Sequence, residues 1–323
     1  MAILMIPLSL LTAVSAAGVR IVEWDVPTLN SFPHDPAVAP DGTLWYTGMQ
    51  SNTLGRLDPK TGTIREYRLK TPDSGPHGLV VDGKGNVWFT ANYKGYIGRL
   101  NPRTGEVAEY PMPDPAARDP HTLVFDEKGV LWFTIQGGNF VGRLDPRTGT
   151  VKLQRLPAPG SRPYGIVVNS RGVPFFCEFG TNRLASIHPE TMEITEYGLP
   201  EGTRPRRLVV GPGDMVYYTD FARGYLGGFD PKSGRVEEWP SPGGTGARPY
   251  GIAATPDGAV WFCESGITPN RIIRFDPKTK TFVGIWPIPS GGGVVRHMVA
   301  TPEGDLYLAC SGVNKVAIIR VRE

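Results

Sequence analysis

The stretch Pro76 to Pro111, PHGLVVDGKGNVWFTANYKGYIGRLNPRTGEVAEYP, decides the fold, because most of the chain repeats it with variations. The segments GLVVD, NVWFTA, YIGRL and EVAEY have the apolar and β-branched composition of short strands. Asp-Gly, Lys-Gly and Asn-Pro-Arg-Thr-Gly sequences separate them and suit tight turns. One unit therefore predicts a four-stranded antiparallel meander.

Copies of this unit can be counted by one residue, here called the anchor, which precedes the large aromatic of the second strand by eleven positions. The anchors are His34, His77, His121, Tyr164, Arg206, Tyr250 and, in a seventh copy interpreted as one residue shorter, His297. They follow one another at intervals of 42 to 47 residues. This period, with four strands per unit, is typical of propeller blades. We predict an all-β, seven-bladed β-propeller of four-stranded antiparallel blades.

The two ends of the chain predict how the ring closes. Residues 20–27, RIVEWDVP, resemble the fourth strand of a blade, whereas residues 315–321 resemble only a third strand. We expect the N-terminal segment to complete the last blade, because this pairing removes an open edge. Residues 19–323 are thus predicted to form a single propeller domain.

Residues 1–18, MAILMIPLSLLTAVSAAG, form an apolar run that ends in small residues. This pattern is typical of a secretory signal peptide cleaved near Ala16 or Ala17, although a basic n-region is missing. The run is short for a membrane span. We expect a periplasmic or secreted protein with no membrane span after signal removal, and a cytoplasmic protein if the segment is not a signal.

The charge balance excludes one class of partner. Lys and Arg number 34 against 31 Asp and Glu, which gives a net charge of +3 with no run of like charge. A nucleic-acid-binding surface needs a concentrated basic patch. We expect a monomer that binds no nucleic acid.

The anchors predict a site at one mouth of the central channel. In an antiparallel pair, the start of the first strand and the end of the second lie at the same edge. Four of the five histidines occupy anchors, and the second strands of the fourth to sixth blades end in acids. The groups expected at this mouth are the histidines His34, His77, His121 and His297, the acids Glu178, Asp220 and Glu264, and the nearby arginines Arg206, Arg207 and Arg296. An imidazole side facing a carboxylate side suits acid/base chemistry or an anionic ligand. A polar ring that only holds backbone groups and channel water is the alternative.

Metal and cysteine signals are weaker. His34, His77 and His121 offer three imidazoles, but no short ligand spacing such as HExxH or CxxC occurs. Cys177 and Cys263 replace the threonine of the WFT segment, where cysteine usually packs as a small apolar residue. An odd number of cysteines argues against a disulfide framework.

The repeated pattern resembles the virginiamycin B lyase (streptogramin lyase) family of seven-bladed propellers. It is carried by PYGI at residues 163–166, DG at 257–258 with WFCE at 261–264, IGRL at 97–100 and EYP at 109–111. The resemblance covers about residues 20 to 321. It implies opening of a cyclic depsipeptide at its ester by elimination rather than hydrolysis, with Mg²⁺ required and with a base and an acid assisting.

Matching the family's site residues to this chain implies specific roles. The family's base, a histidine of the last blade, falls on His297, its sixth-blade histidine falls on Tyr250, and its first-blade tyrosine falls on His34. Two family carboxylates are missing, because their positions fall on Val295 and near Ser311. Glu178 and Glu264 are the replacement ligands available for Mg²⁺.

The leading hypothesis is an exported lyase-like enzyme that eliminates across a carbon–oxygen bond of an ester or cyclic ester, with streptogramin itself not expected as substrate. His297 is the expected base and Tyr250 or His34 the expected acid. The expected substrate-binding residues are His77, His121, Tyr164, Arg206, Arg207 and Arg296. The alternatives are a metal-dependent lactonase or esterase and a non-enzymatic propeller that binds a small ligand or a protein.

Overall fold

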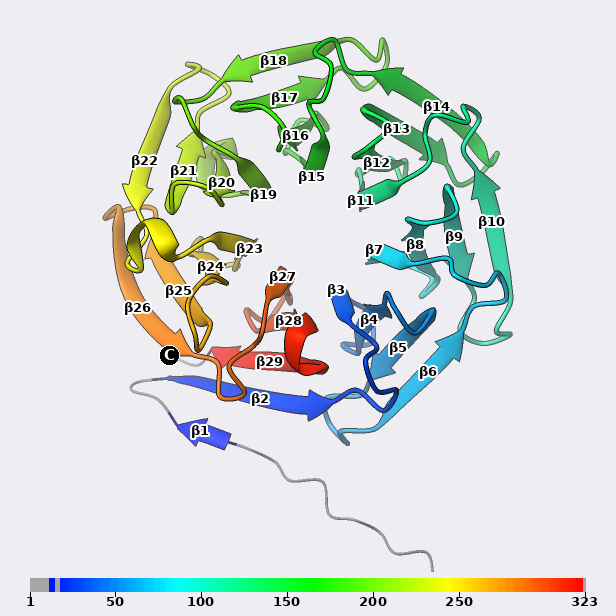
Figure 1. Cartoon of the computed structure of the whole chain (residues 1–323), viewed down its shortest axis with the longest axis horizontal. Helices are drawn as coiled ribbons and strands as arrows, with labels where there is room; N and C mark the ends of the chain where they lie inside the picture. Colours follow the sequence, from blue (N-terminus) through cyan, green and yellow to red (C-terminus); the bar gives the residue numbers. More distant parts are fainter. Residues whose placement is uncertain (1–11, 15–17, 322–323) are drawn as a thin grey trace, which may run out of the picture.

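A computed structural model describes residues 12–14 and 18–321 of the chain. Seven antiparallel sheets surround a central axis like the blades of a propeller (Figure 1). Six sheets have four strands in sequence order, and the seventh has five. The predicted all-β, seven-bladed propeller is therefore confirmed. Within the described ranges, no helix has the length and apolar character needed to cross a membrane.

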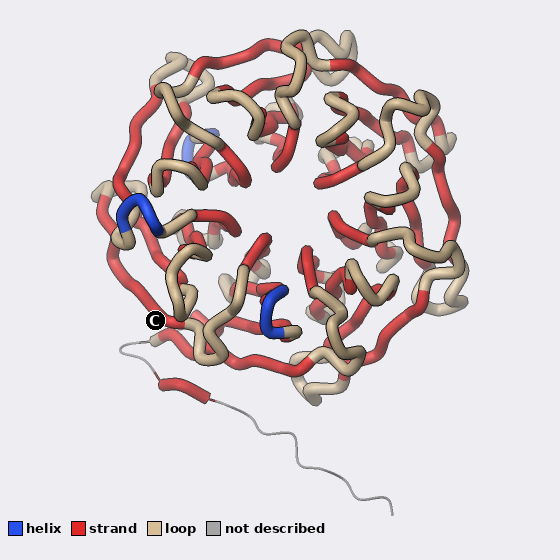
Figure 2. Tube along the Cα trace, in the orientation of Figure 1, coloured by secondary structure: helices blue, strands red, loops and turns tan. Residues whose placement is uncertain are grey.

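The strands fall into four concentric sets around the axis (Figure 2). The first, innermost strands are β3 (Pro33–Val38), β7 (Pro76–Val81), β11 (Pro120–Phe125), β15 (Pro163–Val168), β19 (Pro205–Val210), β23 (Pro249–Ala254) and β27 (Val295–Ala300). The second strands are β4 (Leu44–Gly48), β8 (Val87–Ala91), β12 (Leu131–Ile135), β16 (Pro174–Glu178), β20 (Val216–Asp220), β24 (Val260–Glu264) and β28 (Leu306–Cys310).

The third strands are β5 (Thr53–Leu57), β9 (Tyr96–Leu100), β13 (Phe140–Asp145), β17 (Arg183–Ile187), β21 (Tyr225–Phe229), β25 (Arg271–Asp276) and β29 (Lys315–Val321). The fourth, outermost strands are β6 (Ile64–Arg68), β10 (Val107–Pro111), β14 (Thr150–Arg155), β18 (Ile194–Gly198), β22 (Val236–Pro240), β26 (Thr281–Pro287) and β2 (Val19–Asp25). Strand β1 (Thr12–Val14) and the 3-10 turns η1 (Pro212–Asp214), η2 (Gly244–Gly246) and η3 (Ser311–Val313) complete the described elements.

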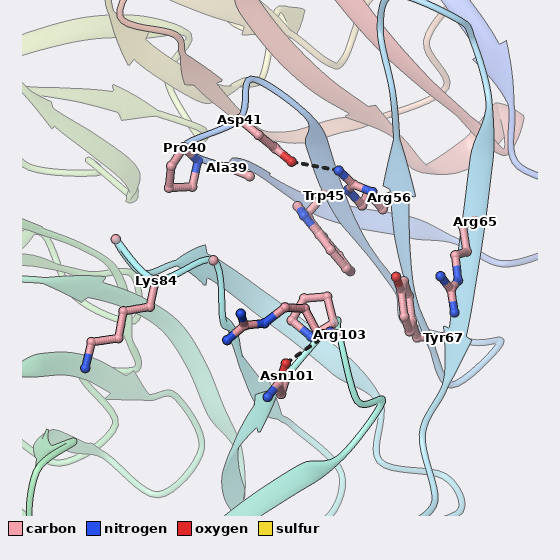
Figure 3. A pocket seen from close by; sticks show the side chains of 13 residues that line it. Ala39, Pro40, Asp41, Trp45, Arg56, Arg65, Tyr67, Lys84, Asn101 and Arg103 are labelled. Atoms are coloured by element: carbon pink, nitrogen blue, oxygen red, sulfur yellow. Dashed lines mark hydrogen bonds and ion pairs between the residues drawn. The ribbon is translucent and has the colours of Figure 1, made fainter.

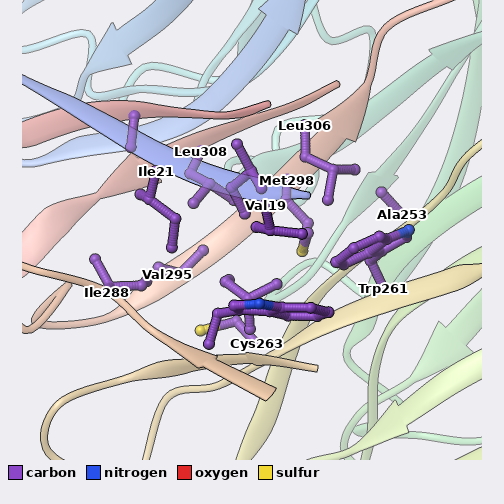
Figure 4. Packing of buried hydrophobic residues seen from close by; sticks show 14 of the residues in the cluster. Val19, Ile21, Ala253, Trp261, Cys263, Ile288, Val295, Met298, Leu306 and Leu308 are labelled. Atoms are coloured by element: carbon purple, nitrogen blue, oxygen red, sulfur yellow. The ribbon is translucent and has the colours of Figure 1, made fainter. Parts of the chain in front are cut away.

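The core lies between the blades. Every residue of the second strand is buried in all seven blades, whereas the outer strand β6 is half-buried or exposed along its length. This gradient explains why the WFT segments are almost wholly apolar while the outer EYP segments alternate. Figure 4 shows one inter-blade layer, in which Trp261 of the sixth blade packs with Met298 and Leu306 of the seventh.

The N-terminal strand closes the ring, as predicted. Strand β2 pairs with β29 along its whole length, from Val19 opposite Val321 to Asp25 opposite Lys315. The two faces of β2 pack against two neighbouring blades. Val19 and Ile21 belong to the core cluster shared with the sixth blade, whereas Val22 and Trp24 belong to the cluster shared with the first blade. The chain ends thus hold the first and last blades together.

The predicted signal peptide falls mostly on residues outside the described part of the chain. Of residues 1–18, the structure describes Thr12–Val14 as strand β1, antiparallel to β2, together with Gly18. Cleavage near Ala16 or Ala17 remains a prediction.

The register of the seventh blade corrects one prediction. In the first blade, Pro33 pairs with Gly48 and Pro36 with Tyr46, so the anchor and one further residue lie between the paired positions. In the seventh blade, Val295 pairs with Cys310 and Met298 with Leu308. Arg296 therefore takes the anchor position, eleven residues before Tyr307, and His297 takes the position after it. The prediction that His297 is an anchor in a shortened repeat is wrong, because strand pairing and not residue type fixes the position.

Candidate functional site

A threonine of the second strand positions the anchors of two blades at once. Thr47 Oγ1 accepts a hydrogen bond from the Asp35 N–H (3.0 Å) and donates one to the carbonyl of His77 in the next blade (2.9 Å). Thr90 repeats both contacts, with the Gly78 N–H and the His121 carbonyl. The threonine of the WFT motif thus holds the anchors of the second, third, fourth and sixth blades in place.

Three imidazole rings and one phenol ring pack side by side around half of this ring, each tilted against the next. The ring centroids of His34 and His77 lie 3.7 Å apart, those of His77 and His121 3.9 Å, and those of His121 and Tyr164 4.0 Å. Each of the four side chains is at most 4% exposed. The predicted grouping of these histidines is observed, but they form a packed plug across the channel and not the walls of an open mouth.

Arginines and tyrosines complete the other half. The guanidinium carbon of Arg206 lies 4.1 Å from the centroid of the Tyr250 ring, and that of Arg296 lies 5.9 Å from the same centroid. The hydroxyl groups of Tyr164 and Tyr250 form a hydrogen bond. Tyr250 is fully buried, whereas Arg206 and Arg296 are half-buried. The two arginines are thus the most accessible members of this half of the ring.

A second polar layer lies directly after the anchors in the first strands. His34 Nδ1 contacts Asp35 Oδ1 at 2.8 Å, and Arg207 Nη2 contacts both oxygens of Asp35 at 2.8 and 3.1 Å. Arg207 Nη1 also donates to Thr122 Oγ1 at 3.1 Å, and Thr122 contacts His121 Nδ1 at 2.9 Å. A continuous hydrogen-bonded network therefore crosses the channel from His34 to His121.

Charge within this network is fixed by the buried ion pair. Burial alone would raise the pKa of the Asp35 carboxyl, but the Arg207 guanidinium and the neighbouring imidazoles hold that pKa well below its ordinary value. Burial lowers the pKa of His34 to about 4, although the contact with Asp35 opposes this shift. At neutral pH, Asp35 is thus ionised and His34 is neutral.

The imidazoles of His77 and His121 are also held neutral. Burial is the main cause that places the pKa of His77 and of His121 well below the ordinary value, and the charge of Arg207 adds to it in both cases. His77 Nδ1 is buried and has no hydrogen-bond partner within the part of the chain that the structure describes. These two rings contribute packing and shape to the site.

His297 lies in the second layer and lines a separate axial cavity. This cavity of about 360 Å³ extends from Asp35, Arg207 and His297 along the aliphatic residues of the first strands of all seven blades. Burial lowers the pKa of His297 to about 3, and Arg207 contributes. Its Nδ1 has no partner among the described residues. The structure therefore separates His297 from the anchors with which it was grouped.

The three strand-end acids do not face the imidazoles across the channel, contrary to the expectation. Glu264 accepts hydrogen bonds from the Gly243 N–H (2.7 Å) and from Arg271 Nε (2.8 Å) on the third strand of its own blade. Asp220 accepts from loop groups that include the Arg204 N–H, and Glu178 accepts from Thr181 Oγ1. Their chain positions are at the expected edge, but their side chains turn toward the outer strands and loops, where donors are available.

These residues do not fit the magnesium centre that the resemblance implied. Glu178 and Glu264 stand on different blades; Arg271 binds Glu264, and Thr181 binds Oε2 of Glu178, whose Oε1 is buried without a partner among the described residues. Among the described residues, the group of metal-ligating side chains closest to one another is His34, Asp35 and His77. Its single carboxylate is already bound on both oxygens by Arg207. Mg²⁺ prefers several oxygen ligands in octahedral geometry, and this set does not provide them.

A further groove lies between the first and second blades, away from the axis (Figure 3). It has a volume of about 420 Å³ and contains four basic residues, Arg56, Arg65, Lys84 and Arg103. Arg56 pairs with Asp41, and the side chains of the other three are exposed. Water therefore solvates most of its charge, in contrast to the arginines of the anchor ring.

Sequence reasoning missed Asp35, the carboxylate at the centre of the network. A signal for it was present, because Asp35 follows its anchor where the second, fourth and sixth copies carry Gly78, Gly165 and Gly251. An acid at a position that otherwise holds glycine, pointing into a closed channel, needs a cationic partner. Arg207, at the same position of the fifth blade, is that partner.

Known proteins are similar to this chain in sequence and in architecture. The sequence profile described as the virginiamycin B lyase family matches residues 12–187 and 174–323. A streptogramin B lyase structure superposes with a TM-score of 0.86 at 26% identity, covering 94% of this chain and 98% of that chain. Virginiamycin B lyase from Staphylococcus aureus superposes with a TM-score of 0.85 at 26% identity, covering 94% and 100%. Its catalytically inactive variant with quinupristin gives 0.84 at 25%, with the same coverage. A search of curated protein sequences gives no match.

Proposed function

Because this chain belongs to the virginiamycin B lyase family, we propose that it is an enzyme that breaks a carbon–oxygen bond of an ester or cyclic ester by elimination. In this proposal His34 is the base and Arg296 stabilises the leaving group. The reaction takes place at the anchor ring, where the first, sixth and seventh blades meet.

The observation that carries the proposal is the contact between His34 Nδ1 and Asp35 Oδ1, with Asp35 held in turn by Arg207. An ionised carboxylate only accepts hydrogen bonds, so His34 Nδ1 is the donor and Nε2 keeps its lone pair. A buried acid that fixes the tautomer and orientation of a histidine is the arrangement found behind general-base imidazoles. The low pKa of His34 keeps this base unprotonated at neutral pH.

The position of the three groups supports the same site. The resemblance placed the family's tyrosine on His34 and its sixth-blade histidine on Tyr250, and both are anchors. The anchor between them on the seventh blade is Arg296. The chain thus keeps one histidine and one tyrosine at these two anchors, but on the opposite blades from the family, and a guanidinium lies between them. These exchanges argue against streptogramin as substrate.

The proposed step uses only side chains of this protein. His34 Nε2 removes a proton from the carbon next to the one that bears the ester oxygen, and the electrons of that C–H bond form a carbon–carbon double bond. The carbon–oxygen bond breaks and its electron pair leaves on a carboxylate. The guanidinium of Arg296 stabilises this new negative charge in a site of low dielectric constant. Tyr250 offers a hydroxyl donor to the same leaving group.

Small esters or lactones are the substrates we propose, for a protein that acts as a monomer outside the cytoplasm. Sequencing the N-terminus of the mature protein would test export, with a start at or shortly after Ala17 as the expected result. Light scattering of the pure protein would test the monomer. Larger species at working concentrations would contradict it.

The test of the reaction is a mass-resolved screen of cyclic esters and lactones with the wild-type protein, with and without Mg²⁺. Ring opening without a change in mass indicates elimination, whereas gain of one water indicates an esterase or lactonase. We expect His34→Gln to reduce turnover about 10²- to 10⁴-fold, and the exposed turn variant His188→Gln to leave it unchanged. Loss of turnover in His297→Ala with full activity in His34→Gln would instead make His297 the base.

A second candidate function, a propeller that binds a small ligand without chemistry, is favoured by the burial of the ring. His34 is 3% exposed and Tyr250 is fully buried, so substrate reaches them only if neighbouring side chains move. Saturable binding of a compound that is recovered unchanged, in both the wild type and His34→Gln, would support this function and remove the enzymatic one.

A further inference from the structure

We infer that the ligand of the anchor ring carries a carboxylate on an aromatic or similarly flat apolar body, held by Arg206, Arg248 and Arg296. This inference rests on the proposed function in placing the ligand at that ring. The three arginines belong to the fifth, sixth and seventh blades, which are neighbours around the axis (Figure 1).

Arg206 and Arg296 are partly desolvated, and neither has an ion-pair partner among the described residues. Both are half-buried, and the Nε atom of each is buried without a hydrogen-bond partner in the described residues. None of the ion pairs between described residues involves Arg206, Arg248 or Arg296. A guanidinium removed from water without an anion is unfavourable, so a bound anion would relieve this cost.

The adjacent Arg207, by contrast, has an internal counter-ion in Asp35. It is 1% exposed and contacts both oxygens of Asp35. The acids at the ends of the second strands of the fifth and sixth blades, Asp220 and Glu264, are bound by Arg223 and Arg271 instead. The positive charge of the cluster is therefore left for a ligand.

Aromatic rings surround the two guanidiniums. The guanidinium carbon of Arg206 lies 4.2 Å from the centroid of Phe221 and 4.8 Å from that of Phe179. The carbon of Arg296 lies 4.9 Å from the centroid of Phe32. These three rings are half-buried, so they present apolar surface beside the charges. Apolar surface next to an unpaired cation matches a ligand with a flat apolar body and one anionic group.

The backbone has an uncommon conformation at Phe32 and at Arg248. Phe32 has φ of 56° and Arg248 has φ of 46°, in the left-handed region that side chains other than glycine and asparagine seldom adopt. Each precedes the proline that starts a first strand. Arg248 lies over Phe221, with 5.8 Å from guanidinium carbon to ring centroid, and is exposed. Gly75 and Arg162 also have positive φ at this position of the second and fourth blades, so the conformation is a feature of the repeat; at Phe32 it places the ring beside Arg296, and at Arg248 it places the guanidinium over Phe221.

The groove of Figure 3 supplies a matched control. The guanidinium carbon of Arg65 lies 4.7 Å from the Tyr67 ring centroid, which is the same kind of contact as those of Arg206. Arg65 is exposed on an outer strand, however, where water solvates its charge. Replacing Arg65 therefore changes the net charge as much as replacing Arg206 does, without touching the proposed site.

The test is a calorimetric titration of the intact protein with benzoate, benzyl alcohol and inorganic phosphate at fixed low salt. We expect saturable binding of benzoate, and binding of neutral benzyl alcohol and of phosphate at least tenfold weaker. Arg206→Gln and Arg296→Gln should each weaken benzoate binding about tenfold or more, because a hydrogen bond to a charged group is lost. Arg296→Lys, which keeps the charge, should weaken it less, and Arg65→Gln should leave it unchanged. A circular dichroism melt checks that each variant is folded.

Three outcomes would overturn the inference: no saturable benzoate binding, equal binding of benzyl alcohol, or an equal loss in Arg65→Gln. Phosphate binding as tight as benzoate would overturn the apolar part of the ligand. Benzoate binding without turnover of any ester would support the inference and remove the proposed reaction. Turnover of a neutral ester that benzoate does not inhibit would support the proposed reaction and remove this inference.

Discussion

At the scale of single residues, the axis of this protein is built from histidines that are kept uncharged. Three packed imidazoles fill one side of the ring, and Arg207 stands close enough to disfavour a second positive charge. The single carboxylate, Asp35, is neutralised by that arginine. This arrangement is stable only while the imidazoles remain neutral.

We predict that the protein loses stability with acid earlier than its carboxylates alone would require. The pKa of His34 is about 4 in the folded state, and those of His77 and His121 also lie well below the ordinary value of 6.5. Between pH 6.5 and 4 the unfolded chain therefore binds protons that the folded chain does not. The free energy of unfolding should be level above pH 6.5 and fall below it by about 1.4 kcal/mol per pH unit for each such histidine.

Urea denaturation at a series of pH values measures this slope. His77→Gln should reduce it by one histidine's share, because His77 has no hydrogen-bond partner among the described residues whose loss would confuse the result. His188→Gln, on an exposed turn, should leave the slope unchanged. A free energy of unfolding that stays level down to pH 4 would show that the imidazoles are charged in the folded protein.

At the scale of one blade, a glycine of the third strand lies opposite an aromatic residue of the second. Phe89 pairs with Gly98, Tyr46 with Gly55 and Tyr218 with Gly227. A Cβ atom added at Gly98 would lie 2.1 Å from Phe89 Cζ. The glycine of the repeated IGRL segment thus leaves the space that the aromatic ring occupies. Glycine is required here for packing and not for a turn.

We predict that Gly98→Ala lowers the free energy of unfolding by roughly 1 to 3 kcal/mol, because the Phe89 ring has to leave its place in a packed core. Gly83→Ala is the control, since no heavy atom lies within 4 Å of an added Cβ there and the residue is exposed. Its effect should stay within about 0.5 kcal/mol. Equal unfolding midpoints in urea for the two variants would contradict the packing argument.

At the scale of the whole molecule, strand β2 joins the first and last blades. Besides its ladder with β29, it buries Glu23, whose carboxylate accepts hydrogen bonds from Ser290 of the loop before the seventh blade. Asn314 Nδ2 donates to the carbonyls of Val26 and Thr28 that follow the strand. Ring closure thus depends on a segment far in sequence from its partners.

We predict that a chain beginning at Thr28 does not form a stable ring. Four apolar side chains of β2, Val19, Ile21, Val22 and Trp24, are each at most 8% exposed. Their burial at about 1.5 to 3 kcal/mol each is comparable with the whole stability of a folded domain. A chain beginning at Gly18 is the control and should melt cooperatively. Adding a peptide of residues 18–28 should restore folding of the shorter chain, whereas an unchanged melting temperature without the peptide would contradict the closure role.

The sequence by itself determined the propeller. Strand length, turn residues and aromatic positions recur every 42 to 46 residues, and six of the seven blades are built from strands consecutive in the chain. Local patterns of this kind are readable because they depend on alternation and turn chemistry. The closing strand was also readable, since the two ends resemble complementary parts of one blade.

Only the tertiary structure decided the site. A one-residue register made Arg296 the anchor and moved His297 to the layer that lines the axial cavity. The ion pair of Asp35 and Arg207 joins residues 172 positions apart, which no local pattern contains. The directions of Glu178 and Glu264 depended on donors in neighbouring strands and loops. Burial, pairing and pKa follow from which side chains meet across the ring, and the folded ring alone brings them together.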